Sequence, residues 1–102
     1  MNKKVRGSKT GRPIMRLLDI LGRRWSLRIL WELRAERLTF RELRTQCDDM
    51  SPTSLNQRLK ELRELNLIDH DEEGFGYTTW GKELGEQLMT LNNWSVGWDK
   101  DS

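Results

Sequence analysis

The chain has 102 residues and a formal net charge of +2; 35% of its residues are hydrophobic and 33% are charged. This length suits one domain with a modest core, and no stretch approaches the ~20 apolar residues of a membrane-spanning helix. The start lacks the apolar run of a signal peptide, and the single cysteine cannot form an intramolecular disulfide, so we expect a cytoplasmic protein with no membrane partner.

Charge is distributed unevenly along the chain. Residues 1–34 hold ten basic and two acidic side chains, residues 35–64 hold six of each, and residues 65–102 hold two basic and eight acidic ones. A polyanion such as DNA would be attracted to the first part and repelled by the last. The alternative is that these charges only keep the surface solvated.

The first twelve residues are polar, basic and glycine-containing, which predicts a flexible arm over residues 1–12. This arm either follows DNA phosphates or serves only as a solubilising tail. Its candidate phosphate contacts are Lys3, Lys4, Arg6 and Lys9.

Two helices are predicted next. Pro13 opens the first, whose apolar side chains recur at helical spacing, and Gly22 ends it. The second runs from Trp25 to about Arg34 and is apolar on more than one side. Such a helix is expected in a central position, between other helices or against a second subunit.

The following stretch predicts a helix-turn-helix. Residues 38–40 are expected to form a short strand, and Thr39 and Glu42 fit a capping box at the start of a helix whose inward face ends at Cys47. After a tight turn, Ser51 caps a longer helix in which the leucines at positions 55, 59 and 62 share one face. A short helix, a turn and a longer helix with a polar outward face form a helix-turn-helix unit.

The longer helix is the candidate DNA-reading element. Its outward hydroxyl and amide side chains suit base edges in the major groove, namely Thr53, Ser54, Asn56 and Gln57. Neighbouring cations suit phosphates, namely Arg41, Arg44, Arg58 and Lys60. Arg58 lies beside the apolar face and could equally brace the helix through an ion pair. Taken alone, the stretch also fits an ordinary amphipathic helix with a solvated face.

A short hairpin and a long helix are predicted for the rest of the chain. Residues 67–69 and 75–78 form the strands of a wing with an acidic turn, and Thr78 caps a helix that runs to about Trp98. The apolar stripe of this helix indicates a subunit interface, unless the helix packs on its own domain. The expected fold is mainly α (α+β), a winged helix-turn-helix over residues 13–98 with about five helices and a two- or three-stranded wing sheet, followed by a tail at 99–102.

With these elements in order, the chain resembles the HxlR-type winged helix-turn-helix regulators, relatives of the MarR class. The most specific match is residues 18–33, where a leucine-rich segment precedes Gly-basic-Trp and an Ile-Leu-x-x-Leu helix, and further matches lie at 40–43, 50–55, 58–62 and 77–84. The resemblance implies a homodimeric, DNA-binding transcription regulator whose first and last helices build the dimer. The expected dimer contacts are Ile14, Leu17, Leu21, Leu84, Leu88, Leu91, Trp94 and Trp98.

Two departures from the family pattern change what we expect. Members commonly have Cys-Pro at the start of the first helix, and some use that cysteine as a sensor, whereas this chain has Arg12-Pro13. We therefore expect no sensing by that route and assign Cys47 to core packing. The wing is short and acidic instead of long and basic, so its contact with DNA is doubtful and the arm is expected to replace part of it.

An enzyme is not expected. His70 is the single histidine, no second histidine or further cysteine can complete a metal site or a nucleophile–base pair, and no cofactor motif is present. We predict a sequence-specific transcriptional regulator that binds double-stranded DNA as a homodimer on a palindromic operator, with a small-molecule effector left open. The alternatives are a winged-helix protein–protein interaction module and a non-specific architectural DNA binder.

Overall fold

The computed structural model describes residues 11–101, and within them five helices and a two-stranded antiparallel sheet follow one another. The predicted mainly α winged helix-turn-helix is confirmed. The elements are α1 (Pro13–Leu21), α2 (Ser26–Glu32), α3 (Phe40–Gln46), α4 (Pro52–Glu64), β1 (Ile68–Asp71), β2 (Gly74–Tyr77) and α5 (Thr79–Asp101). No helix in this part of the chain is long and apolar enough to cross a membrane.

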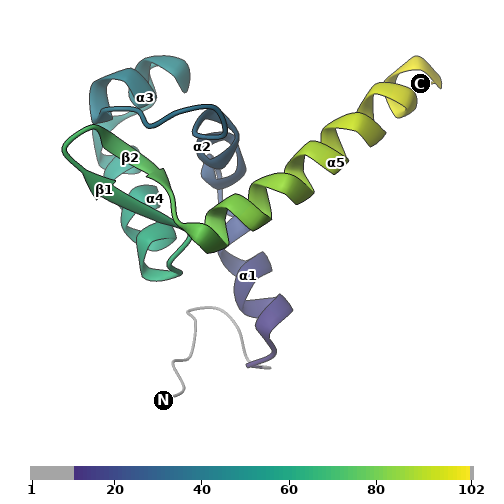
Figure 1. Cartoon of the computed structure of the whole chain (residues 1–102), viewed down its shortest axis with the longest axis horizontal. Helices are drawn as coiled ribbons and strands as arrows, with labels where there is room; N and C mark the ends of the chain where they lie inside the picture. The colour runs from purple at the N-terminus through teal and green to yellow at the C-terminus, as the bar shows by residue number, and fades with distance from the viewer. Residues whose placement is uncertain (1–10, 102) are drawn as a thin grey trace.

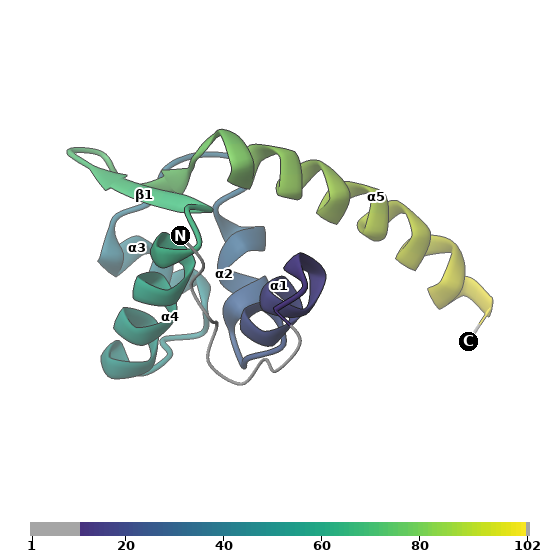
Figure 2. The ribbon, with the colours of Figure 1, turned by 90° about the horizontal axis from the view of Figure 1, so that it is seen from below.

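The elements form a body with one long projection. Helices α2, α3 and α4 form the body, the β1–β2 hairpin lies in front of α4, and α5 leaves the body beside the hairpin and extends away from it to the C-terminus (Figure 1). Turning the molecule shows α1 beside α2, on the same side of the body as α5 (Figure 2). The winged body therefore lies at one end of the molecule and the far end of α5 at the other.

The core lies between α2, α3 and α4. Ile29, Leu43, Leu55 and Leu62 are each completely buried there. Each such side chain stabilises the fold by about 1.5–3 kcal/mol relative to leaving it in water. The leucine face predicted for α4 thus packs inward, which leaves the polar face of α4 outward.

Side-chain caps set the starts of three helices. Thr39 Oγ1 accepts from the Glu42 N–H at 3.1 Å and Glu42 Oε1 accepts from the Thr39 N–H at 2.9 Å, so the capping box of α3 is confirmed. Ser51 Oγ accepts from the Ser54 N–H at 3.1 Å and caps α4, while Thr78 Oγ1 accepts from a first-turn N–H of α5 at 3.0 Å. Each cap satisfies a backbone donor that the helix itself cannot pair.

Several boundaries differ from the predicted ones. The strands predicted at 67–69 and 75–78 are observed as β1 (Ile68–Asp71) and β2 (Gly74–Tyr77). Helix α2 begins at Ser26 because Trp25 has a left-handed backbone with a φ of 80°. The strand predicted at 38–40 is a single bridge from Leu38 to Phe75, because α3 already starts at residue 40. Helix α5 continues to Asp101 instead of ending near residue 98, since no glycine or proline follows to stop it.

Candidate nucleic-acid interface

The turn between α3 and α4 sets the angle of the helix-turn-helix. Asp48 and Asp49 have φ values of 60° and 56°, a left-handed conformation that aspartate tolerates better than most residues. The Arg44 side chain closes the turn, because its Nε donates to the Met50 carbonyl at 2.6 Å. Arg44, predicted to bind phosphate, is therefore engaged in holding the turn.

The four predicted base-reading residues are exposed together on the first two turns of α4, namely Thr53, Ser54, Asn56 and Gln57. Pro52 opens the helix and the Ser51 cap orients its first turn. The arrangement presents hydroxyl and amide groups on one outward surface. Such groups can donate hydrogen bonds to base edges in the major groove and accept hydrogen bonds from them.

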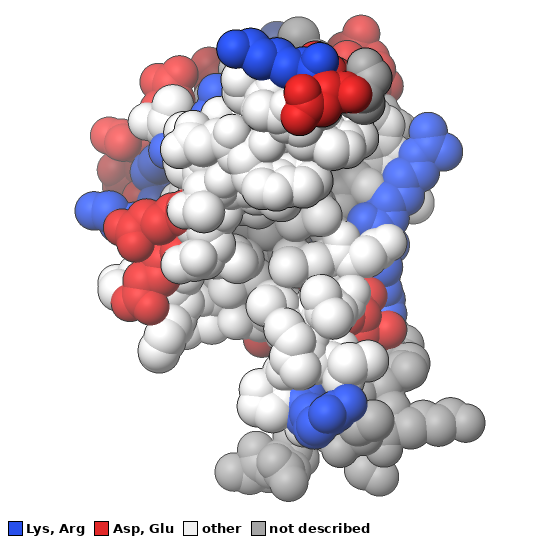
Figure 3. All heavy atoms as spheres, turned by 90° about the vertical axis from the view of Figure 1, so that its right-hand side faces the viewer, with Lys and Arg blue, Asp and Glu red and all other residues white. Residues whose placement is uncertain are grey.

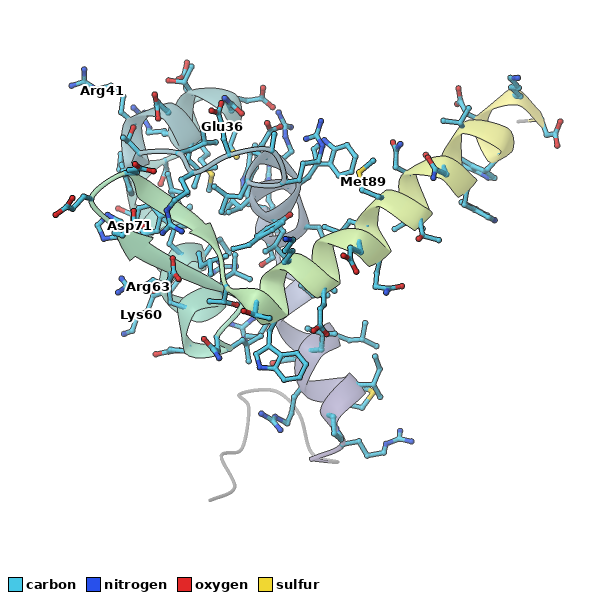
Figure 4. The ribbon with its side chains drawn as sticks, viewed as in Figure 1. Glu36, Arg41, Lys60, Arg63, Asp71 and Met89 are labelled. Atoms are coloured by element: carbon cyan, nitrogen blue, oxygen red, sulfur yellow. The ribbon has the colours of Figure 1, made fainter. Side chains whose placement is uncertain are left out.

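Three exposed cations lie on the same two helices, α3 and α4. Arg41 of α3 and Lys60 and Arg63 of α4 are exposed and point outward, away from α5 (Figure 4). Within residues 11–101, the side chains of these three cations form no ion pair and no hydrogen bond, although the backbone carbonyls of Arg41 and Arg63 accept hydrogen bonds. Sequence reasoning missed Arg63, although its spacing of three from Lys60 places the two on one helix face.

Arg58 is engaged within the protein. Its Nε lies 3.1 Å from Glu61 Oε1, and its side chain is only 20% exposed. Of its two predicted roles, the structure shows the ion pair that braces α4. The arm residues Lys3, Lys4, Arg6 and Lys9 lie outside the described residues.

Glu61 was not singled out from the sequence, and it is buried on the inner side of α4 at 2% exposure. Arg23 Nη1 donates to its Oε2 at 2.6 Å and Gln57 Nε2 donates to the same oxygen at 2.9 Å. Burial acts to raise the pKa of the Glu61 carboxyl, but the Gln57 hydrogen bond and the charges of Arg58 and Arg23 outweigh it and hold this pKa below its ordinary value. The spacing of three residues between Arg58 and Glu61 is a local pattern from which their ion pair could have been predicted. Arg23 is too distant in sequence from Glu61 for any local pattern to indicate their contact.

Two of the four acidic residues of the wing pair with one arginine, which cancels one of their two negative charges. Arg37, between α2 and α3, pairs with Asp69 and, at 3.0 Å, with Asp71. The hydrogen bond from Arg37 to Asp69 is the largest cause of a raised pKa for the guanidinium. Glu72 and Glu73 form the exposed turn of the hairpin. The negative charge that would meet a phosphate backbone is therefore concentrated at the tip of the wing.

A second exposed surface is apolar and belongs to α1 and α5. Ile14, Leu91, Trp94 and Trp98, all predicted dimer contacts, are 52–62% exposed. The other predicted contacts, Leu17, Leu21, Leu84 and Leu88, are half-buried against the core. Leu18 and Val96 join the exposed set, which we call the apolar surface, and Figure 3 shows a broad uncharged area on this side of the molecule.

Cys47 is completely buried beside α3. Burial, the largest cause, raises the pKa of its thiol to about 11. At neutral pH almost none of it is the reactive thiolate. Its position agrees with core packing and not with sensing.

The fold and the exposed face of α4 define a winged helix-turn-helix protein of the DNA-binding class. The profile of the HxlR-like helix-turn-helix family matches residues 20–102, and the chain belongs to this family. It is a family of transcription regulators and not of enzymes. The chain is also 26% identical over 88 residues to an uncharacterized HTH-type transcriptional regulator from Methanocaldococcus jannaschii, covering 82% of this chain and 83% of that protein.

Solved structures share the fold. Quinone-bound YodB from B. subtilis superposes with a TM-score of 0.74 at 23% identity, covering 82% of this chain and 96% of that one. A possible HxlR family factor from Thermoplasma volcanium GSS1 gives a TM-score of 0.74 at 23% identity, with 87% and 86% covered. A MarR family regulator from Enterococcus faecalis V583 gives 0.75 at 19% identity, with 97% and 96% covered.

Proposed function

We propose that this HxlR-type regulator acts in the cytoplasm as a homodimer that reads a palindromic operator, with α4 of each subunit in a major groove. The observation that carries the proposal is the polar surface on the first two turns of α4, together with the outward cations Arg41, Lys60 and Arg63 on α3 and α4. Hydroxyls and amides can specify bases, and cations that pair with nothing in the described protein are available to phosphates.

The dimensions of α4 suit this task. Its 13 residues span about 20 Å at ~1.5 Å per residue, and the major groove, ~12 Å wide, admits a helix. The Ser51 cap lies at the N-terminal end, where recognition helices commonly approach the bases. Arg44 and Arg58 act in this arrangement by fixing α4 in place, and Lys60 remains a direct phosphate ligand.

The N-terminal arm and the wing are expected to contribute differently to DNA binding. The basic arm, residues 1–12, contributes further phosphate contacts and compensates in part for the acidic wing. Glu72 and Glu73 at the wing tip are held away from the phosphates. Residues 13–98 make up the DNA-binding and dimerising domain.

The dimer forms through the apolar surface. Ile14 and Leu18 of α1 and Leu91 and Trp94 of α5 are each at least half exposed in the single chain, which is unusual for large apolar side chains that function in water. A groove of about 360 Å³ between α2 and α5, lined in part by Leu27, adjoins this surface. A two-fold dimer repeats α4 at two half-sites about one helical turn of DNA apart, which predicts an inverted repeat.

Selection from a random-sequence DNA pool at low and at physiological salt tests the proposal. We expect enrichment of an inverted repeat at both salt concentrations, with affinity falling as salt rises. Uniform retention without enrichment would identify a non-specific architectural binder instead. No retention at either salt concentration would contradict DNA binding and favour a protein–protein interaction module. A variant with Gln57 and Lys60 replaced by alanine tests whether α4 makes the contact, because both changes alter the proposed contact surface. DNA binding that is indifferent to both changes would contradict the role of α4.

A further inference from the structure

A continuous chain of polar contacts joins α1 to the exposed face of α4. Asp19 of α1 lies 3.4 Å from Arg23, which donates to Glu61 at 2.6 Å. Glu61 in turn accepts from the Gln57 amide at 2.9 Å. The buried carboxylate of Glu61 thereby connects the α1–α2 corner with one of the candidate base-reading side chains.

Glu61 itself is not placed to touch DNA. It is 2% exposed on the inner side of α4, whereas Lys60 and Arg63, close by in sequence, point outward (Figure 4). Gln57, which is exposed and one helical turn earlier, is the candidate base-reading side chain that Glu61 contacts directly, whereas its pair with Arg58 braces the helix.

The contact fixes which way the Gln57 amide faces. An ionised carboxylate can only accept hydrogen bonds, so the amide nitrogen of Gln57 must be the group directed to Glu61. The amide oxygen and the second amide hydrogen then remain for a ligand. Adenine offers its N6 amino group as donor and its N7 as acceptor on one edge, and a glutamine amide of fixed orientation matches this pair.

We propose that Glu61 is a positioning residue for DNA reading, whose buried carboxylate orients the Gln57 amide toward an adenine edge while Arg23 ties that orientation to the α1–α2 corner. This inference rests on the proposed function, because it requires α4 to lie in the major groove. It goes further by naming the base and the side chain that sets the preference.

The test measures base preference position by position in the full chain, by selection from a randomised DNA pool. The wild-type protein is expected to prefer adenine at one position of each half-site, and Gln57→Ala to lose that preference, roughly tenfold. Glu61→Gln is expected to lose most of the same preference and to leave the other positions unchanged. The double variant is expected to behave like Gln57→Ala, because both changes act on one contact.

Glu64→Gln is the matched control, because it removes the same charge from the same helix at an exposed position. It is expected to change overall affinity without changing any base preference. If Gln57→Ala changes one position and Glu61→Gln does not, the positioning role is wrong while the proposed function stands. If the wild-type protein retains no DNA, the proposed function fails first, so the two failures are distinguishable.

A variant at a buried site can fail to fold, so Glu61→Asp provides a second approach. It keeps a buried negative charge but withdraws the carboxylate by one methylene from Gln57 and from the two arginines, and it is expected to weaken the adenine preference. The side-chain amide resonance of Gln57, followed by NMR without DNA, is expected to exchange slowly in the wild-type protein and faster in Glu61→Asp. Fast exchange of this amide in the wild-type protein would overturn the inference.

Discussion

Glu61 is the one charged side chain that residues 11–101 bury, and its charge makes the stability of the protein depend on pH. Its pKa is lowered in the folded state, from an ordinary value of about 4.5. Its stabilising contribution is therefore complete above the unfolded-state pKa and is lost as pH falls through the folded-state pKa. We expect the wild-type free energy of unfolding to drop on acidification more steeply than that of Glu61→Gln.

Urea unfolding between pH 7 and pH 3 checks this expectation. At pH 7, Glu61→Gln is expected to be less stable than the wild-type protein by roughly 1–3 kcal/mol, because two arginines lose a charged partner. The difference should shrink toward pH 3. Glu64→Gln, at an exposed position, should follow the wild-type curve. Parallel curves for Glu61→Gln and the wild-type protein would show that the Glu61 carboxyl does not have a lowered pKa.

Cys47 illustrates the opposite case, a titratable group that burial keeps neutral. Its thiol has a pKa raised to about 11 and no exposed surface. We expect a thiol-specific reagent at pH 8 to label the native protein at least a hundredfold more slowly than the urea-unfolded chain, since labelling requires the protein to open. Labelling at the same rate with and without urea would instead indicate an accessible, reactive cysteine.

At the scale of elements, two glycines of α5 should respond oppositely to alanine. A Cβ at Gly81 would lie 1.9 Å from the Leu67 carbonyl oxygen, whereas a Cβ at Gly97 would meet nothing within 4 Å. Gly81→Ala is expected to cost about 1–3 kcal/mol by forcing α5 from the body. Gly97→Ala is expected to stabilise the helix by up to about 1 kcal/mol. Thermal unfolding of both variants at one protein concentration provides the measurement, and equal shifts would contradict the close packing at Gly81.

Elements governed by local chemistry could be predicted from the sequence. The Thr39–Glu42 capping box, the Ser51 cap and the leucine face of α4 depend on residues within one or two helical turns, so their spacing was sufficient. Features that depend on distant partners were missed. Arg37 pairs with two aspartates of the wing that lie more than thirty residues later in the chain, and the pairing of Arg23 with Glu61 spans 38 residues. The left-handed backbone of Trp25 also has no sequence signal, because tryptophan rarely adopts it.

The same distinction applies to the candidate site. The exposure of Thr53, Ser54 and Asn56 follows from helical spacing alone, so the sequence located the face. Which cations are engaged within the protein does not follow from spacing. Arg44 reaches a backbone carbonyl of the turn, and Arg58 reaches a buried carboxylate. Only the three-dimensional arrangement separates such bracing arginines from the cations that are available to DNA.

At the scale of the whole molecule, the polar face of α4 and the apolar surface of α1 and α5 lie in positions that are compatible with simultaneous DNA binding and dimerisation. The outward face of α4 lies at the end of the molecule that carries α3 and the hairpin, while the far end of α5 lies at the other (Figure 1). A partner subunit bound to the C-terminal half of α5 therefore leaves α4 accessible. A dimer built this way presents two copies of α4 to one duplex, and each half-site adds its own binding free energy.

The apolar surface of α5 gives the sharpest prediction at this scale. Leu91 and Trp94 lie one helical turn apart and are 55% and 62% exposed, so replacing both by lysine removes little from the core of a single subunit. In a dimer interface the same change buries two charges without partners, and we expect the dissociation constant to rise at least a hundredfold. Analytical ultracentrifugation should show the wild-type chain at twice its mass of 12.2 kDa and the variant at 12.2 kDa. The helical circular dichroism of each subunit should be retained.

Asn93→Lys is the matched control, because it adds a positive charge to the same exposed stretch of α5 without removing an apolar side chain. It is expected to remain dimeric.

The double lysine variant should also lose affinity for an inverted repeat while keeping weak, salt-sensitive binding to a single half-site, since its α4 is unchanged. A wild-type protein that sediments as a monomer would refute the dimer itself. A double variant that still dimerises would place the interface on another surface, and intact affinity of a monomeric variant for the inverted repeat would separate DNA reading from dimerisation.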